Sequence, residues 1–249
     1  MTHVVIGTTL TTYTMLDPDR DFLWKAWLFH ADEIVRRADV AGIRVSFFVA
    51  IELDGRGVMP FAPLIARIRE LSGEYWTYSL LDNRSAITQA NRGRHITFGQ
   101  NLISEYATSI GATHLLHMAA DCEPPQDVLE KLLAVHHPLV AAECTTYCQA
   151  LGNRERLNWV LRDGTACAVE QGPMTAVCVL IHRTLFKTIK WRWDPDLGMT
   201  DDPSFSHDAR TLFHVDTLTR MDCVAIHHPQ AIGPIETRFP GLDMSIPQE

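Results

Sequence analysis

Two carboxylates stand two residues apart, directly after an apolar run, in the stretch HLLHMAADCEPP at residues 114–125. The run is typical of a buried strand, so Asp121 and Glu123 come where that strand reaches the surface. An unpaired carboxylate is costly to bury, and this acidic corner therefore either lies in water or binds a cation. Mg²⁺ and Mn²⁺ accept oxygen ligands and need few carboxylates when phosphates and waters complete the shell. The residues by themselves leave both interpretations open.

A second acidic pair, Asp201 and Asp202, stands directly before Pro203 and a helical pattern. A carboxylate can take the proton of a hydroxyl group as a general base. A neighbouring carboxylate raises the pKa of that base by like-charge repulsion. Asp followed by Pro is also a common helix start, so the pair could serve to cap the helix. The two roles are compatible.

The segment DNRSAITQANRGRH at residues 82–95 contains three arginines. A guanidinium group offers forked donors that suit phosphate oxygens. Arg84, Arg92 and Arg94 are therefore candidates for binding a diphosphate, and three solvated arginines in a polar loop are the alternative.

The elements that must position these residues alternate along the chain. Apolar runs predict strands, and apolar residues at helical spacing between them predict helices. Gly42 and Gly111 follow two of the helical patterns, where C-terminal caps are expected. The alternation predicts an α/β fold with a mostly parallel, twisted sheet flanked by helices on both faces. The predicted strands are 3–7, 43–51, 75–81, 113–118, 138–144, 175–183 and 221–228, and the predicted helices are 21–42, 60–73, 98–110, 124–135 and 204–214.

Length and charge limit the classes of protein to consider. The 249 residues suit a single domain over 1–249, with a loop or insertion at 146–171 and an irregular tail at 229–249. A net charge of −8 gives no overall positive field for gripping polyanions, although a local basic patch could still bind phosphate or nucleic acid. With no long apolar segment and no leader, we expect a cytoplasmic protein without a membrane span.

The six cysteines are scattered without a Cys-x-x-Cys pair, which is typical of reduced thiols rather than a disulfide framework. Cys144 and Cys148, with His136 and His137 upstream, could hold zinc, but their spacing fits no common zinc finger. No His-x-His or His-x-x-x-His run is present, which argues against a zinc hydrolase.

Four segments, in sequence order, resemble segments of nucleotide-sugar-dependent glycosyltransferases with the GT-A, Rossmann-like fold, especially the family-2-like group. GATHLLHMAADCEPPQDVLEKLL is similar to that family's metal-binding strand end, hhhhDxDxxP, and the helix after it. GPMTAVCVLIHRTLF is similar to its Gly-bearing strand, and WDPDLGMTDDPSFSHDAR resembles its acidic ED-x-x-F segment. CVAIHHPQ resembles the late strand whose histidine completes the metal shell in many members. The similarity covers Val4 to Pro229 apart from 146–171.

The resemblance implies transfer of a sugar from a nucleoside-diphosphate sugar to an acceptor hydroxyl, helped by Mn²⁺ or Mg²⁺. Asp202 would be the general base of an inverting transfer, assisted by Asp201. The metal ligands that it implies are Asp121, Glu123 and His228.

The same resemblance implies a nucleotide site at the ends of the first two strands. Thr8 and Thr9 would contact the nucleotide, and Glu52 would contact its base or ribose. Arg84 and Arg94 would neutralise its phosphates. A UDP-sugar is the favoured donor and a GDP-sugar is possible, whereas the acceptor could be a protein, a glycan, a lipid-linked intermediate or a modified nucleic-acid base.

One position departs from the family pattern. Ala119 stands at the position of the first Asp of D-x-D, which in the family usually contacts the ribose or a metal-bound water. Glu123 could compensate, because D-x-E places both carboxylates on one side of an extended segment. The departure makes a non-catalytic nucleotide-sugar-binding relative the alternative function. A nucleotidyltransferase is disfavoured, because GTTLTTYTML has one Gly and no Lys or Arg.

Overall fold

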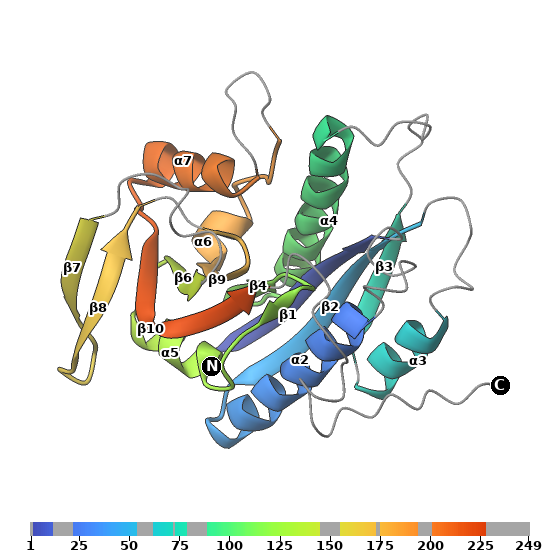
Figure 1. Cartoon of the computed structure of the whole chain (residues 1–249), viewed down its shortest axis with the longest axis horizontal. Coiled ribbons are helices and arrows are strands. Elements are labelled where there is room, and N and C mark those ends of the chain that lie inside the picture. Colours follow the sequence, from blue (N-terminus) through green and yellow to red (C-terminus); the bar gives the residue numbers. More distant parts are fainter. Residues whose placement is uncertain are drawn as a thin grey trace.

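The computed structural model describes residues 2–11, 22–53, 62–71, 73–78, 89–144, 155–172, 175–193 and 201–227. Within these ranges the chain forms one twisted sheet with helices packed against it (Figure 1). The strands are β1 (His3–Thr11), β2 (Arg44–Glu52), β3 (Glu74–Tyr78), β4 (His114–Met118), β5 (Cys122–Glu123), β6 (Leu139–Cys144), β7 (Glu155–Val160), β8 (Ala166–Gln171), β9 (Cys178–His182) and β10 (Leu218–His227). The helices are α2 (Phe22–Val40), α3 (Ala62–Glu70), α4 (Gln89–Ser109), α5 (Val128–Ala134), α6 (Arg183–Phe186) and α7 (Asp201–Phe213).

The strand order is β3-β2-β1-β4-β9-β6-β10-β8-β7, and β5 pairs with β10 outside this path. Strands β3, β2, β1 and β4 run parallel to one another, and β10 runs parallel to β6. The pairs on both sides of β9, and those that β8 makes with β10 and β7, are antiparallel. The predicted α/β class is therefore confirmed, whereas the sheet is mixed rather than mostly parallel.

The predicted loop or insertion at 146–171 contains a β-hairpin. Strands β7 and β8 pair antiparallel from Glu155 with Gln171 to Val160 with Ala166. Most of their side chains are exposed or half-buried, because the hairpin forms the edge of the sheet farthest from β3 (Figure 1). An edge strand of this kind lacks the apolar run on which the sequence-based prediction depended.

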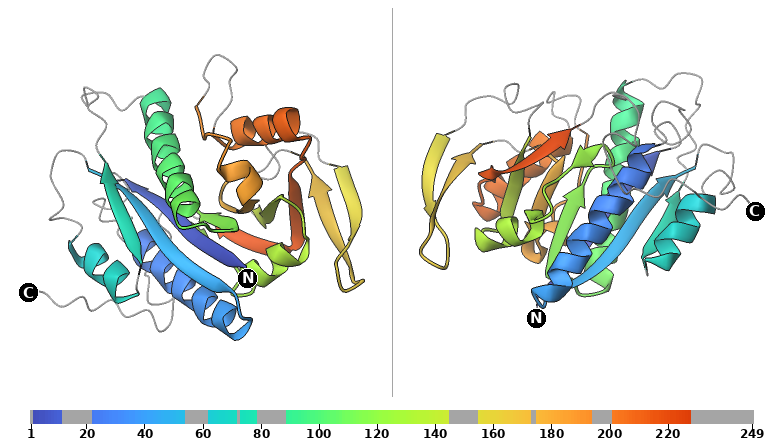
Figure 2. Two further views of the ribbon diagram at one scale, coloured as in Figure 1. Left: turned by 180° about the vertical axis from the view of Figure 1, so that it is seen from behind. Right: turned by 60° about the horizontal axis from the view of Figure 1, so that its bottom comes forward.

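Helices cover both faces of the sheet, as predicted (Figure 2). One core joins α2, α3 and α5 to the sheet through residues such as Trp27, Ile68 and Leu132. The other core joins α4, α6 and α7 to the opposite face through residues such as Ile103 and Phe205. Successive residues of the central strands alternate between the two cores, which is why these strands are apolar without a break.

The predicted helix ends at Gly42 and Gly111 are confirmed by left-handed backbone angles, with φ of 68° and 69°. After α2, the Ile43 amide donates to the Ala38 carbonyl at 2.9 Å, and after α4 the Ala112 amide donates to the Ala107 carbonyl at 2.9 Å. This six-to-one bond needs a residue with positive φ before it, which glycine adopts without a steric penalty.

Helix α4 lies so close to β1 that glycine is required at the contact. A Cβ atom on Gly99 would stand 2.5 Å from Thr9 Cγ2 and 2.9 Å from Tyr78 Oη. We expect Gly99→Ala to lower the free energy of unfolding by about 1–3 kcal/mol, because a packed interface must shift to admit the methyl group. Urea unfolding measures this loss. Gly111→Asn, at an exposed cap with open space around it, is the comparison and should lose less.

A pair of histidines at the start of β4 should make the fold less stable in acid. His114 pairs with His182 across β4 and β9, with ring centroids 5.1 Å apart. Burial, followed by the nearby His182 and His136, lowers the pKa of His114 to about 4. The folded state therefore resists protonation that the unfolded chain accepts below about pH 6.5, so stability falls between about pH 6.5 and 4.

We expect His114→Gln to remove part of this loss. Because His114 is partly exposed, its share should be about 1–2 kcal/mol rather than the full value of the pKa shift. Urea unfolding of both proteins at pH 7 and pH 4.5 measures it. An equal loss in the two proteins would show that His114 is not responsible.

Candidate active site

Several of the predicted site residues lie at the carboxyl edge of the parallel strands. In the register, Thr11 of β1 lies beside Glu52, and Glu52 lies beside Tyr78 of β3. Strand β4 runs in the same direction and ends at Met118, three residues before Asp121. Ligands of open α/β sheets commonly bind at such an edge. Glu52 and the acidic corner of Asp121 therefore lie along one edge of the sheet.

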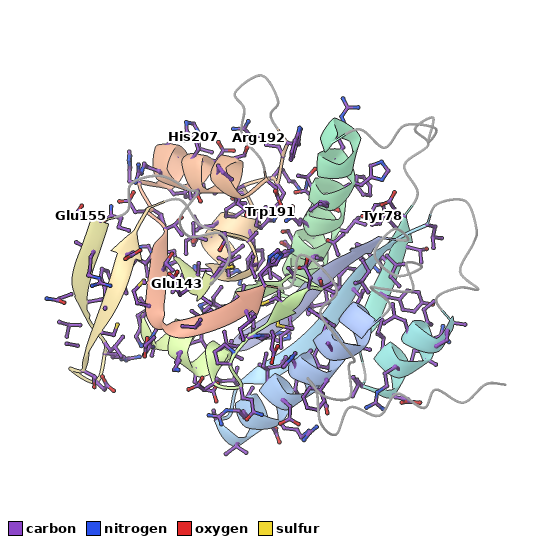
Figure 3. All side chains as sticks on the ribbon, viewed as in Figure 1. Tyr78, Glu143, Glu155, Trp191, Arg192 and His207 are labelled. Atoms are coloured by element: carbon purple, nitrogen blue, oxygen red, sulfur yellow. The ribbon has the colours of Figure 1, made fainter. Side chains whose placement is uncertain are left out.

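The first part of the site is a buried glutamate held by a histidine. Glu52 is only 6% exposed, and its Oε1 is in hydrogen-bonding contact with Nδ1 of His95 on α4. Tyr78 Oη donates to the His95 carbonyl at 2.8 Å. Burial, and next the charge of Glu52, raise the pKa of Tyr78, so its phenol stays protonated and remains a donor. Figure 3 shows Tyr78 beside the end of β3.

The two threonines predicted to contact a nucleotide lie on opposite faces of β1. A Cβ on Gly99 of α4 would meet the Thr9 side chain, so Thr9 faces α4, the side on which Glu52 meets His95. Thr8 follows the alternation of Ile6 and Leu10, which belong to the core beneath α2. Within the described part of the chain, both hydroxyls are buried without a hydrogen-bond partner. The structure therefore brings Thr9, but not Thr8, onto the same face as Glu52.

The predicted arginines are less well placed by the structure. Arg94 is exposed on α4, directly before His95. Arg84 and the side chain of Arg92 lie outside the described residues. His95 was missed by the sequence analysis, although it ends the same basic segment. Its partner Glu52 is 43 positions away, so no local pattern could have joined the two.

The acidic corner after β4 meets the end of β10. Asp121 Oδ2 lies 3.2 Å from His227 Nε2, and the two side chains are 27% and 9% exposed. The contact exists because β5 pairs antiparallel with β10, with Cys122 opposite His227 and Glu123 opposite Ile226. Glu123 is half-buried on β5, two residues after Asp121.

Asp121 and His227 are the possible metal ligands that the described residues bring together. His228 lies outside the described residues, and His227 beside it is the histidine that reaches Asp121. Within the described part of the chain, no three His, Cys, Asp or Glu side chains come together as a metal-binding group. Asp121 and His227 would fit a Mn²⁺ or Mg²⁺ ion whose other ligands are phosphate oxygens and waters. The zinc alternative has no such support, because Cys144 is buried in the core and Cys148 is not described.

The acidic pair at the start of α7 is held by two neighbouring elements. Asp202 Oδ2 accepts a hydrogen bond from the Ala176 amide at 2.7 Å, just before β9. Gln100 Nε2 on α4 donates to Asp201 Oδ2 at 2.8 Å. Burial of the Asp202 carboxyl, then the charge of Asp201 and a hydrogen bond between the two carboxyls, raise the pKa of Asp202 well above its ordinary value. Asp202 is therefore more basic than a surface aspartate.

Backbone bonds connect the acidic pair to the acidic corner. The amide of Ala119, two residues before Asp121, donates to the Val177 carbonyl at 2.8 Å. Ala176, which precedes Val177, donates to Asp202. The two acidic groups are therefore attached to the same short segment before β9. Ala119, which stands at the position of the family's first Asp, takes part through its backbone amide, and its side chain packs against the core beneath α2 and α5.

A buried histidine completes the junction. His117 Nδ1 donates to the Ala176 carbonyl at 2.9 Å, so its proton is on Nδ1. Burial lowers its pKa and keeps the ring neutral. The ring centroids of His117 and Trp191 are 5.5 Å apart, and those of Trp191 and Phe205 of α7 are 4.4 Å apart. Figure 3 shows Trp191 between α7 and α4. The sequence analysis missed His117, because it reads as part of an apolar strand.

Comparison with known proteins shows similarity at the level of solved structures. No protein-family model matches the sequence, and no curated protein matches it significantly. A protein described as a nucleotide-diphospho-sugar transferase from Desulfovibrio desulfuricans is 12% identical, with 92% of this chain and 84% of that chain covered and a TM-score of 0.45.

GalNAc-T7, crystallised with UDP, GalNAc and Mn²⁺, is 10% identical, with a TM-score of 0.49; the aligned region covers 94% of this chain but only 45% of that chain. Mannose-1-phosphate geranyltransferase from Thermus thermophilus is 14% identical, with 89% and 74% of the two chains covered and a TM-score of 0.42. These similarities concern the fold, and the functional argument rests on the geometry of the site.

Among the described helices, none combines the length and the apolar character needed to cross a bilayer.

Proposed function

We propose that this chain is a metal-dependent glycosyltransferase that moves a sugar from a nucleoside-diphosphate sugar to an acceptor hydroxyl with inversion. The observation that carries the proposal is that both acidic groups are attached to the short segment before β9. The Ala176 amide of that segment donates to Asp202, whose pKa is raised. The next residue, Val177, accepts from the amide of Ala119, two residues before the Asp121 that contacts His227. Acceptor activation needs a base, and donor cleavage needs positive charge at the leaving diphosphate. The two acidic groups have residues suited to both.

Asp202 is the general base in this proposal. In its ionised form it takes the proton of the acceptor hydroxyl while the acceptor oxygen forms its bond to the anomeric carbon. The bond between that carbon and the diphosphate breaks in the same displacement, and the electron pair leaves with the diphosphate. The Ala176 amide holds Oδ2 of Asp202, and Oδ1 would be the oxygen that takes the proton.

Asp121 would hold Mn²⁺ or Mg²⁺ together with His227, and the ion would neutralise the charge that develops on the leaving diphosphate. Glu123, half-buried on β5, and His228, which lies outside the described residues, remain predicted ligands. On the donor's nucleotide side, Glu52 would accept a hydrogen bond from a base or ribose. A UDP-sugar is the donor that we favour, with a GDP-sugar as the second choice.

The arginines and threonines have a supporting role in the proposal. Arg94 and Arg84 would approach the diphosphate oxygens from the segment that leads into α4. Thr9 would line the same face as Glu52, whereas Thr8 would support β1 from the other side. The acceptor remains one of the hydroxyl-bearing classes named above.

A non-catalytic nucleotide-sugar-binding protein is the second candidate. The observation that favours it is Ala119 at the position of the first family Asp, together with only two side-chain metal ligands among the described residues. Such a protein would bind the donor without cleaving it.

A thermal-shift panel of UDP-, GDP-, ADP- and dTDP-sugars, with and without Mn²⁺, tests the proposal. We expect one nucleotide class to raise Tm, and more strongly with Mn²⁺, because a ligand that binds only the folded state stabilises it. Release of free nucleoside diphosphate from that donor would then separate the enzyme from the binding protein. Stabilisation by none of the donors would contradict both candidates.

A further inference from the structure

The acidic pair of α7 is tied to the rest of the protein by contacts that differ between its two members. Asp202 accepts from the Ala176 amide, whereas Asp201 accepts from the side chain of Gln100, which is 1% exposed. The two carboxyls are neighbours in the first turn of α7, and ionisation of one opposes ionisation of the other by like-charge repulsion. The surroundings of the pair therefore decide which carboxyl is ionised first.

The orientation of the Gln100 amide indicates that Asp201 is the ionised carboxyl. Its Nε2 faces Asp201, and its Oε1 is buried with no hydrogen-bond partner among the described residues. A protonated Asp201 could satisfy that Oε1 by donating to it after a flip of the amide. An ionised Asp201 can only accept, and it therefore requires the N–H side. Hydrogen bonds to an ionised acceptor are also roughly twice as strong as neutral ones.

We propose that Gln100 is a positioning residue that fixes the first negative charge of the acidic pair on Asp201 and leaves Asp202 as the carboxyl that keeps its proton longer. This inference rests on the proposed function only for its catalytic meaning. In the resting protein Asp202 would carry the proton, and it would act as a base only after losing that proton. Gln100 would thus act through Asp201, without touching the substrate.

Among the other described groups around the pair, one backbone amide opposes the effect of Gln100. His117 faces it from β4, but its proton is on Nδ1 and its ring is kept neutral by burial. The segment before β9 contributes the Ala176 amide, which favours charge on Asp202 and therefore opposes the effect of Gln100. From α4 the contact is the uncharged amide of Gln100. The outcome thus depends on Gln100 outweighing one backbone amide.

Carboxyl-carbon NMR of the protein labelled with ¹³C at aspartate tests the proposal without any substrate. Asp201→Asn and Asp202→Asn identify the two signals, and a pH titration then gives the order of ionisation. We expect the Asp201 carbon to report the first ionisation and the Asp202 carbon the second. We expect Gln100→Met, which keeps the volume but removes the donor, to move the first transition upward by about one pH unit.

Asn101→Ala is the matched control, because Asn101 makes two equally short bonds from α4 to the Trp191 backbone at 2.9 Å. It should leave both transitions in place. First ionisation at Asp202, or an unchanged first transition in Gln100→Met, would overturn the proposal. If Gln100→Met does not fold, the order of ionisation in the unaltered protein decides by itself.

The outcome is separable from that of the proposed function. If Asp201 ionises before Asp202 but no donor is cleaved, the role of Gln100 is supported and the glycosyltransferase proposal lacks its activity. Donor cleavage with the reverse NMR order would support the enzyme and reject the role of Gln100.

Discussion

Replacing Asp202 with asparagine is expected to lower the rate of donor cleavage by about 10²- to 10⁴-fold, the range that a positioned general base contributes. The asparagine side-chain oxygen can still accept the Ala176 amide, so the local fold should persist. The measurement is release of free nucleoside diphosphate from the donor that the thermal-shift panel identifies, followed as a function of pH. In the unaltered protein the rate should rise with pH as Asp202 loses its proton, and this limb should vanish in the variant.

The same variant should be more stable than the unaltered protein at neutral pH. The folded-state pKa of Asp202 is raised above its unfolded value, so its contribution to stability is full at low pH and is lost as pH rises through the folded pKa. Asparagine removes this loss, and Tm at pH 7 should increase. Lower activity with higher stability is the expected signature of a functional residue.

Asp208→Asn is the control on the same helix. Asp208 forms an ion pair with Arg192 at 2.9 Å and lies in the second turn of α7, away from the pair. Its loss should leave the rate of donor cleavage unchanged. A rate for Asp202→Asn within a few-fold of the unaltered protein would exclude Asp202 as the base.

The second large effect is expected from Asp121→Ala. Loss of this carboxylate removes the anionic side chain that His227 contacts at the acidic corner. Mutation of residues that only support metal ligands typically lowers metal affinity by about 10–100-fold. We therefore expect Asp121→Ala to lower Mn²⁺ affinity by at least that factor. The Mn²⁺-dependent part of the nucleotide-sugar thermal shift should disappear, whereas the shift seen without Mn²⁺ should remain.

Asp127→Ala provides the comparison, because Asp127 is an exposed aspartate six residues further on that pairs with Lys131 at 3.2 Å. It should keep the full Mn²⁺-dependent shift. His227→Asn should weaken the shift less than Asp121→Ala, since an amide can still supply a neutral ligand. An undiminished Mn²⁺ effect in Asp121→Ala would place the metal elsewhere.

The parts of this fold that could be predicted are those with local causes. Central strands β1, β2 and β4 have apolar runs because both of their faces are covered. The ends of α2 and α4 are marked by glycines with positive φ. These features lie within a few residues of their cause, so sequence spacing is enough to find them.

The parts that could not be predicted depend on partners far apart in the chain. Gln100 and Asp201 are 101 positions apart, and no residue near Gln100 signals that its amide will meet a carboxylate. The choice between His227 and His228 depends on the register of β10 against β5, where a shift of one residue reverses every side chain. The hairpin at 155–171 was missed because its strands lie at an edge and bury little.

The position of β9 between β4 and β6 has a consequence for how the protein is made. A ribosome synthesises β4 and β6 first, so a nascent chain exposes their unpaired edges until residues 178–182 have emerged. Pairing between distant segments is slow, because the closure of a long loop precedes the contacts that reward it. Strand β9 therefore joins the two halves of the sheet late in biosynthesis, and translation arrested before it would yield a chain that lacks both this connection and the acidic pair of α7.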